Sequence, residues 1–156
     1  MMRMQLGTLE ISSPAFSHGN RIPKLYSVEG EGHSPELSFV GVPAQAKELV
    51  LICHDPDAPL TYGFTHWVIY GIPTDAKGLR ENCGEVYISG VNELGNAGWV
   101  PPAPPPGHGD HFYYFQLFAL DMSLGLDPGL SRAELLAKID DHILEQARLV
   151  GTYSRS

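Results

Sequence analysis

Aspartate, histidine and tyrosine side chains that could do chemistry occur in three short segments of this 156-residue chain. Asp55 and Asp57 follow an apolar run, His66 opens a second run, and His111 and Tyr113 open a third. Imidazole and phenol groups can donate hydrogen bonds to phosphate-like oxygens, and a carboxylate can orient an imidazole. These residue types predict a pocket for a small anion. If protonated imidazoles hold the anion, binding should weaken as the pH rises through their titration.

The elements that must position these side chains are predicted to be β-strands. Apolar runs bounded by turn residues are typical of short strands. The runs are Leu6–Ile11, Leu37–Val40, Glu48–Cys53, His66–Ile72, Glu85–Ser89 and His111–Leu120. Residues 101–106, which are five prolines and an alanine, predict a loop with polyproline II character. The candidate side chains therefore lie at strand ends, where binding residues on a rigid scaffold usually occur.

Strand alternation predicts which side chains share a face. In the third run, His111, Tyr113 and Phe115 are expected on one face. In the second run, the same rule puts His66 on the face opposite to Trp67. On that side His66 would lie with Val68 and Tyr70.

One helix is predicted, from Arg132 to about Val150. Ser131 and Glu134 have the spacing of a capping box, and Gly151 marks the expected stop. Apolar residues recur between them at helical spacing: Leu135, Leu136, Ile139, Ile143 and Ala147. Many short strands, proline-rich turns and one late helix predict a mainly β fold, an antiparallel sandwich. The length predicts a single domain over residues 1–156.

Composition narrows the classes of partner. The formal net charge of −8 disfavours binding to nucleic acid and to anionic membrane surfaces. Cys53 and Cys83 form neither a disulfide framework nor a zinc pattern, so two reduced thiols are expected. No run approaches the roughly 20 apolar residues of a membrane span, and Met1–Leu9 lacks the features of a signal peptide. A cytoplasmic location and no integral membrane association are expected.

Other interpretations of the same residues remain open. The nearest approach to a paired metal-ligand spacing is His108-Gly-Asp-His111, and no Gly-x-Ser-x-Gly nucleophile motif is present. We therefore expect a binding protein without cofactor or metal, and keep a hydrolase or metal-dependent enzyme as the alternative. Each residue also has a structural explanation: Asp55 could cap a turn, and Tyr113 could fill a core.

The candidate segments also form a recognisable combination. They read Asp55-Pro56-Asp57-Ala58-Pro59, then His66-Trp67, then Gly107-His108-Gly109-Asp110-His111-Phe112-Tyr113. Ser13-Pro14-Ala15-Phe16, Asn92-Glu93-Leu94-Gly95 and Gly151-Thr152-Tyr153-Ser154-Arg155 extend the pattern over most of the chain. In order and spacing, this combination resembles the phosphatidylethanolamine-binding protein (PEBP) family, its bacterial and archaeal branch in particular.

The resemblance implies a PEBP-like antiparallel Greek-key β-sandwich, with one larger and one smaller sheet and a C-terminal helix. It also implies a pocket for phosphate, phosphoryl head groups or acetate-like groups. The family's pocket positions fall on Asp55, Asp57, Pro59, His66, Pro102, His111 and Tyr113. Some family members inhibit kinases or serine proteases, so a protein kinase or protease is a further candidate partner. A homodimer is left open.

The chain departs from the family pattern near the expected pocket. Phe112 replaces an arginine, Val100-Pro101 replaces a glycine pair, and Ala103 replaces a cysteine. Phe39 stands where the family usually has tryptophan. Proline has no N–H, so Pro101 removes one backbone donor from the expected pocket. Head-group recognition is therefore expected to differ from the family pattern.

Overall fold

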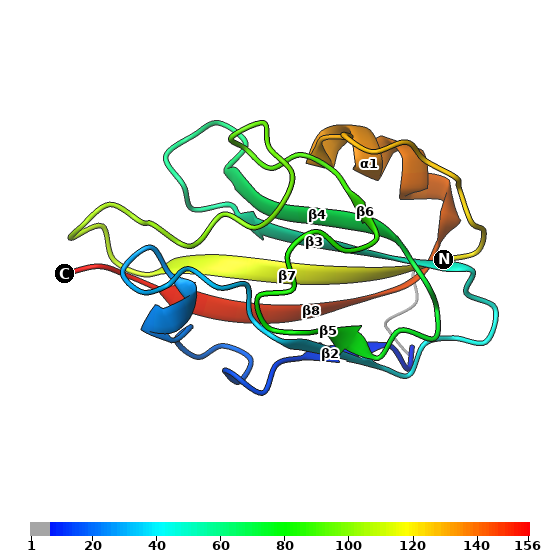
Figure 1. The fold of residues 1–156 in the computed structure, drawn as a ribbon, viewed down its shortest axis with the longest axis horizontal. Helices are drawn as coiled ribbons and strands as arrows, with labels where there is room; N and C mark the ends of the chain where they lie inside the picture. The colour runs from blue at the N-terminus through cyan, green and yellow to red at the C-terminus, as the bar shows by residue number, and fades with distance from the viewer. Residues whose placement is uncertain (1–6) are drawn as a thin grey trace.

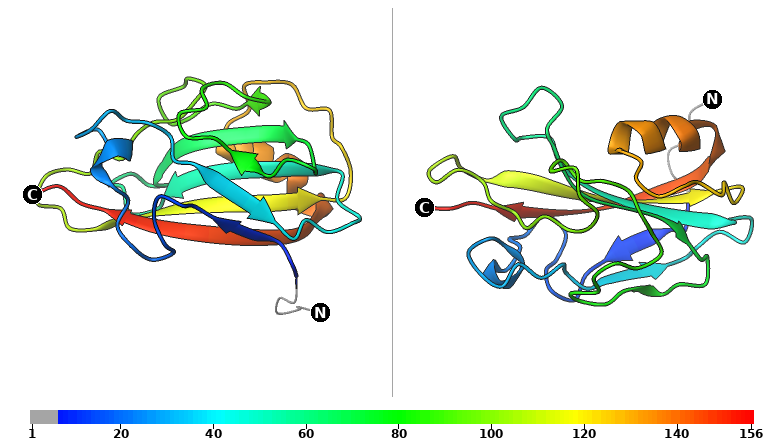
Figure 2. Two further views of the ribbon diagram at one scale, coloured as in Figure 1. Left: turned by 60° about the horizontal axis from the view of Figure 1, so that its bottom comes forward. Right: turned by 45° about the horizontal axis from the view of Figure 1, so that its top comes forward.

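The computed structural model describes residues 7–156, which form two antiparallel sheets that face each other. The smaller sheet has the order β1-β2-β5, with β1 (Glu10–Ser12), β2 (Leu37–Val40) and β5 (Gly78–Leu79). The larger sheet has the order β6-β4-β3-β7-β8. Its strands are β3 (Glu48–Asp55), β4 (Phe64–Ile72), β6 (Ile88–Ser89), β7 (His111–Leu120) and β8 (Ile143–Tyr153). These layers, drawn in Figures 1 and 2, confirm the mainly β fold class and the larger and smaller antiparallel sheets.

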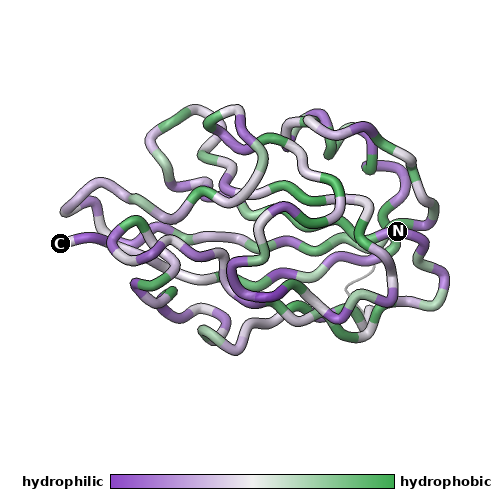
Figure 3. Tube along the Cα trace, viewed as in Figure 1, coloured by the Kyte–Doolittle hydropathy of each residue, from purple (hydrophilic) through white to green (hydrophobic). Residues whose placement is uncertain are grey.

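Helix α1 (Arg132–Ile139) covers the outer face of the larger sheet (Figure 2, right). The central strand β3 is buried along its whole length, because one face meets the smaller sheet and the other meets the helix. Alternate residues divide between two cores: Leu49 and Leu51 lie between the sheets, whereas Val50 and Ile52 lie beneath α1. Figure 3 shows hydrophobic and hydrophilic residues interspersed along the chain, and along β8 the more exposed residues alternate with the less exposed ones, as expected of a two-faced strand.

Most predicted strands are confirmed, and two have the predicted bounds. Leu37–Val40 is β2 and His111–Leu120 is β7. The run Glu48–Cys53 continues to Asp55 in β3. The run that was expected to begin at His66 begins two residues earlier in β4.

The small strands are predicted less well. The run Glu85–Ser89 contributes only Ile88–Ser89 as β6, and β5 was not predicted because two residues carry no periodicity. β1 begins at Glu10, and Leu6 of the predicted first strand lies outside the described residues. Within residues 7–156, no helix has the length and apolarity that crossing a membrane requires.

The helix prediction is correct at its start and wrong after Ile139. Ser131 caps α1 as a capping box: its hydroxyl accepts the Glu134 N–H, and the Glu134 carboxylate accepts the Ser131 N–H. A short 3₁₀ helix, Asp140–His142, follows. Residues 143–153, most of which were predicted to be helical, form β8 instead.

Tertiary pairing explains why the last segment is a strand. β8 pairs antiparallel with the whole of β7, from His111 opposite Tyr153 to Leu120 opposite Ile143. Without this partner, the ten-residue β7 would lie at the sheet edge with unpaired backbone groups. The helical propensity of the Leu-Glu-Gln-Ala-Arg stretch is a weak local preference, and the long-range ladder overrides it. Gly151, expected as a helix stop, lies buried within the strand.

Candidate functional site

A pocket of about 280 Å³ opens where β3 ends and β4 and β7 begin, beside the proline-rich loop. Its polar side chains come from all three strands, whereas alanines, prolines and other apolar side chains form most of the wall. The lining residues are Asp55, Ala58, Pro59, Leu60, Phe64, His66, Val100, Pro101, Ala103, Pro104, Pro105, His111 and Tyr113. An apolar wall with a few convergent polar groups is typical of small-molecule sites.

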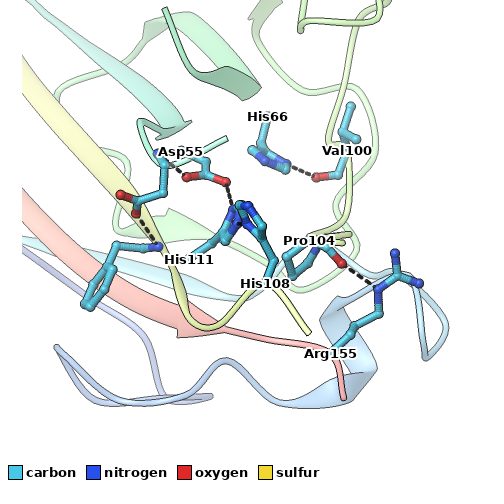
Figure 4. Close-up of polar contacts among 9 residues, drawn as sticks. Asp55, His66, Val100, Pro104, His108, His111 and Arg155 are labelled. Atoms are coloured by element: carbon cyan, nitrogen blue, oxygen red, sulfur yellow. Dashed lines mark hydrogen bonds and ion pairs between the residues drawn. The ribbon is translucent and has the colours of Figure 1, made fainter. Parts of the chain in front are cut away.

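Asp55, the last residue of β3, is only 2% exposed, but both of its carboxylate oxygens have partners. Oδ1 accepts the backbone N–H of Asp57 at 2.7 Å, which shapes the turn that follows the strand. Oδ2 lies 2.7 Å from Nδ1 of His111 (Figure 4). A buried carboxylate is tolerated only when it is hydrogen-bonded, so these contacts allow Asp55 to lie in the pocket wall.

His111 connects the carboxylate to a further histidine. An ionised carboxylate can only accept, so the hydrogen bond to Asp55 places a proton on Nδ1 of His111. The other ring nitrogen, Nε2, lies 2.7 Å from Nδ1 of His108, which is an exposed residue (Figure 4). The three side chains therefore form a chain of hydrogen bonds from the buried end of β3 to the surface.

A β-bulge places His66 in the pocket, and the predicted alternation is wrong at this residue. Cys53 pairs with Trp67 and His54 pairs with Thr65, so His66 is an extra residue in β4. Trp67 lies in the core between the sheets, and His66 lines the pocket on that same side. Bulges commonly redirect a side chain next to a binding site, as this one does.

A backbone contact fixes the orientation of the His66 ring. Its Nδ1 lies 2.6 Å from the carbonyl oxygen of Val100, in the loop that precedes the prolines. A carbonyl oxygen can only accept, so Nδ1 of His66 carries the proton. His66 is 4% exposed, and burial lowers its pKa to about 4 despite this hydrogen bond and the nearby charge of Asp55. Near neutral pH, His66 therefore offers the pocket a neutral ring.

The low pKa of His66 leads to the first prediction. We expect the His66 ring to stay neutral, with its proton on Nδ1, from pH 8 down to about pH 5, whereas an ordinary histidine titrates near 6.5. Because the folded pKa lies below the unfolded value, the contribution of His66 to stability is lost as the pH falls from about 6.5 through 4. Imidazole ¹⁵N chemical shifts would measure both properties. A His66 inflection at pH 6 or above would contradict this assignment.

Tyr113 provides a hydroxyl group from the first residues of β7. As predicted, alternation places it on the face of His111 and Phe115, and its ring meets the His66 ring edge-on at 5.1 Å. Burial, and secondarily the charge of Asp55, raises the pKa of Tyr113 well above the usual value for tyrosine. The phenol therefore remains protonated and can donate a hydrogen bond.

The proline-rich wall is held by the C-terminal segment. The Arg155 guanidinium donates from Nε to the carbonyl oxygen of Pro104 at 2.7 Å (Figure 4). The carbonyl oxygen of Arg155 accepts the N–H of Gly107 at 3.0 Å. Arg155 therefore contacts the loop at two points, and it lies two residues after the end of β8, the strand that pairs with β7.

Five of the seven sequence-predicted site residues lie around the pocket: Asp55, Pro59, His66, His111 and Tyr113. The other two lie outside its lining. The exposed Asp57 accepts the Phe112 N–H with its carboxylate at 2.9 Å. Pro102 is buried, and its carbonyl oxygen accepts the N–H of Val28 at 3.0 Å.

The site also depends on three residues that were not predicted from the sequence: His108, Val100 and Arg155. His108 stood in the sequence as half of a histidine pair and within the family motif, but it was not among the predicted site residues. The contact of the Val100 carbonyl with His66 spans 34 residues, and the contact of Arg155 with Pro104 spans 51. No local sequence pattern could reveal contacts over such separations. Among residues 7–156, no group of three histidine, cysteine, aspartate or glutamate side chains is arranged to hold a metal ion.

Comparison with known proteins identifies the family. The family profile described as phosphatidylethanolamine-binding protein matches residues 12–154. The chain belongs to the phosphatidylethanolamine-binding protein family. A UPF0098 protein from Methanothermobacter thermautotrophicus is 43% identical over 153 residues, covering 94% of this chain and 99% of that protein. A UPF0098 protein from Chlamydia trachomatis is 40% identical over 151 residues, covering 94% and 99%. These relatives place the chain in the prokaryotic branch of the PEBP family.

Solved structures agree with the PEBP assignment. A PEBP homologue from Chlamydia trachomatis superposes with a TM-score of 0.90 at 39% identity, covering 97% of this chain and all of that one. Escherichia coli YbcL, described as a member of the mammalian PEBP family, gives a TM-score of 0.89 at 24% identity, covering 96% and 100%. The YbcL comparison supports the fold alone. Together they confirm the PEBP-like fold that the motifs predicted.

Proposed function

We propose that this PEBP-family protein binds a small oxyanion, such as phosphate, a phosphoryl head group or a carboxylate, in the pocket between β3, β4 and β7. The observation that carries the proposal is the convergence of His66, His111 and Tyr113 from two strands within one largely apolar pocket. The Tyr113 phenol can donate a hydrogen bond to an anionic oxygen. The hydrogen bond between Asp55 and Nδ1 of His111 fixes the orientation of the His111 ring. Preformed polar groups in an apolar wall favour binding because little ordering is needed.

Anion binding can be tested by NMR titration. We expect phosphate at millimolar concentration to shift the His66 and His111 resonances, and chloride at matched ionic strength to leave them unchanged. His142 offers a matched control, because it also contacts an aspartate, Asp121, at 2.9 Å, but lies more exposed. The absence of any shift at His66 and His111 would contradict the proposal.

We propose binding without turnover. None of the described residues that line the pocket is a serine, threonine or cysteine, the side chains that most often act as hydroxyl or thiol nucleophiles. The hydrolase alternative remains testable with p-nitrophenyl phosphate and p-nitrophenyl acetate, with and without added divalent metal ions. Turnover that is lost in His111→Ala would favour the enzyme instead.

A protein partner is a second candidate function, which one surface feature favours. Leu60 and Tyr62, in the turn that borders the pocket, are 54% and 85% exposed. Aromatic side chains at such positions often anchor protein interfaces. Inhibition assays against panels of serine proteases and protein kinases, comparing the chain with Tyr62→Ser and His66→Ala, would separate a surface effect from a pocket effect.

A further inference from the structure

The hydrogen-bonding capacity of the pocket follows from which ring nitrogens already carry protons. Nδ1 of His66 donates to the Val100 carbonyl, so Nε2 of this neutral ring is a lone pair. No hydrogen bond joins that Nε2 to any other group within residues 7–156. The inner end of the pocket therefore contains an acceptor where an anion-binding histidine would ordinarily present an N–H donor.

His111 offers no free donor either. Its Nδ1–H donates to the Asp55 carboxylate, and its Nε2 is taken up by the contact with His108. Among the lining side chains, Tyr113 can donate a hydrogen bond to a ligand, because its phenol stays protonated. The pocket thus pairs one hydroxyl donor with one imidazole acceptor.

Charged and titratable groups also surround the lone pair of His66. The titratable groups around His66 are Asp55 and His54 on β3, Glu93 in the loop before Val100, and His111 and Tyr113 on β7. Asp55 places a buried carboxylate in the same wall, so a ligand oxygen that carries a hydrogen is favoured there over a bare anionic oxygen. A ligand that fits must offer an anionic oxygen to Tyr113 and a hydrogen atom to His66.

We propose that the pocket selects oxyanions that still carry a proton, namely hydrogen phosphate and the monoanion of a phosphomonoester, and rejects sulfate. This inference rests on the proposed anion-binding function and names its ligand class. Sulfate has the same tetrahedral shape but no hydrogen, so one of its oxygens would face the lone pair of His66. A site built to accept a ligand hydrogen discriminates strongly against an analogue without one, because its own polar group is left unpaired.

Calorimetric titration of the full chain with sodium phosphate, methyl phosphate and sodium sulfate at pH 5 and pH 8 tests this selectivity. Inorganic phosphate carries a proton at both pH values, whereas a phosphomonoester loses its last proton near pH 6. We expect phosphate to bind at both values and sulfate to bind at least about tenfold more weakly at both, a difference of about 1.4 kcal/mol. Methyl phosphate is expected to match phosphate at pH 5 and to weaken about tenfold at pH 8.

The outcomes distinguish the proposed selectivity for protonated oxyanions from the proposed anion binding itself. Equal affinities for phosphate and sulfate would overturn the proton selectivity and leave the anion pocket standing. Failure of all three anions to bind would overturn both proposals.

A variant adds a second test. His66→Leu removes the acceptor, so we expect it to bind phosphate and sulfate equally, whereas His142→Leu retains the preference. A His66→Leu protein that still prefers phosphate tenfold would contradict the assigned role of His66. If His66→Leu does not fold, the comparison of phosphate with sulfate in the unmodified chain still decides.

Discussion

Asp55→Asn is expected to lower the free energy of unfolding by about 2–3 kcal/mol and to move the proton of His111 from Nδ1 to Nε2. The Asn amide oxygen can still accept the Asp57 N–H, which leaves its NH₂ group facing Nδ1 of His111. Two donors cannot share that contact, so the His111 ring must present a lone pair there. A neutral hydrogen bond thus replaces a stronger charge-assisted one, and both partners are about 3% exposed, so water cannot make up the difference.

Chemical denaturation would measure the stability of this variant, and imidazole ¹⁵N shifts would report the tautomer. Asp121→Asn is the matched control, because Asp121 also contacts a histidine Nδ1, that of His142, at 2.9 Å. These side chains are 47% and 30% exposed, so the control should lose less than about 1 kcal/mol. An Asp55→Asn protein with unchanged stability and an Nδ1-protonated His111 would refute this description of the site.

Trp67→Ala is expected to cost about 3–5 kcal/mol, the largest stability loss predicted for a single side chain. Trp67 is 1% exposed, lies in the core between the two sheets, and meets the Trp99 ring edge-on at 5.5 Å. Truncation would leave a cavity beside the bulge that positions His66 and beside the Trp99 ring, which precedes Val100 in the chain. We therefore expect weakened phosphate binding as well as lower stability.

Thermal and chemical unfolding of Trp67→Ala would be compared with Tyr62→Ala, which removes a side chain that is 85% exposed. The surface variant should stay within about 0.5 kcal/mol of the original protein. Trp67→Phe should fall between the two, because it keeps part of the buried ring. A loss below about 1 kcal/mol in Trp67→Ala would show that the core does not depend on this side chain.

Much of the pocket could be predicted from local patterns. The apolar run that ends at Asp55 indicated a buried strand, and the alternation along β7 correctly placed His111 and Tyr113 on one face. The capping box at Ser131 correctly marked the start of α1. These features succeed because they depend on residues within a few positions of one another. Helix caps and strand faces are properties of the local chain.

The position of His66 could not be predicted in the same way. Alternation within β4 puts this residue on the face opposite to Trp67, but the pairing of β4 with β3 inserts it as an extra residue. A bulge depends on the register between two strands, which sequence periodicity within one strand does not contain. The end of α1 has the same kind of cause, because β8 is a strand only where β7 is available as its partner.

The candidate pocket is therefore determined at two levels. The chain by itself determined the residue types and the strand ends that carry Asp55, His111 and Tyr113. Only the tertiary structure decided that His66 turns into the pocket and that its proton faces the Val100 carbonyl. The physical reason is that a histidine's donor and acceptor roles are set by the group that its other nitrogen contacts, and here that group lies 34 residues away.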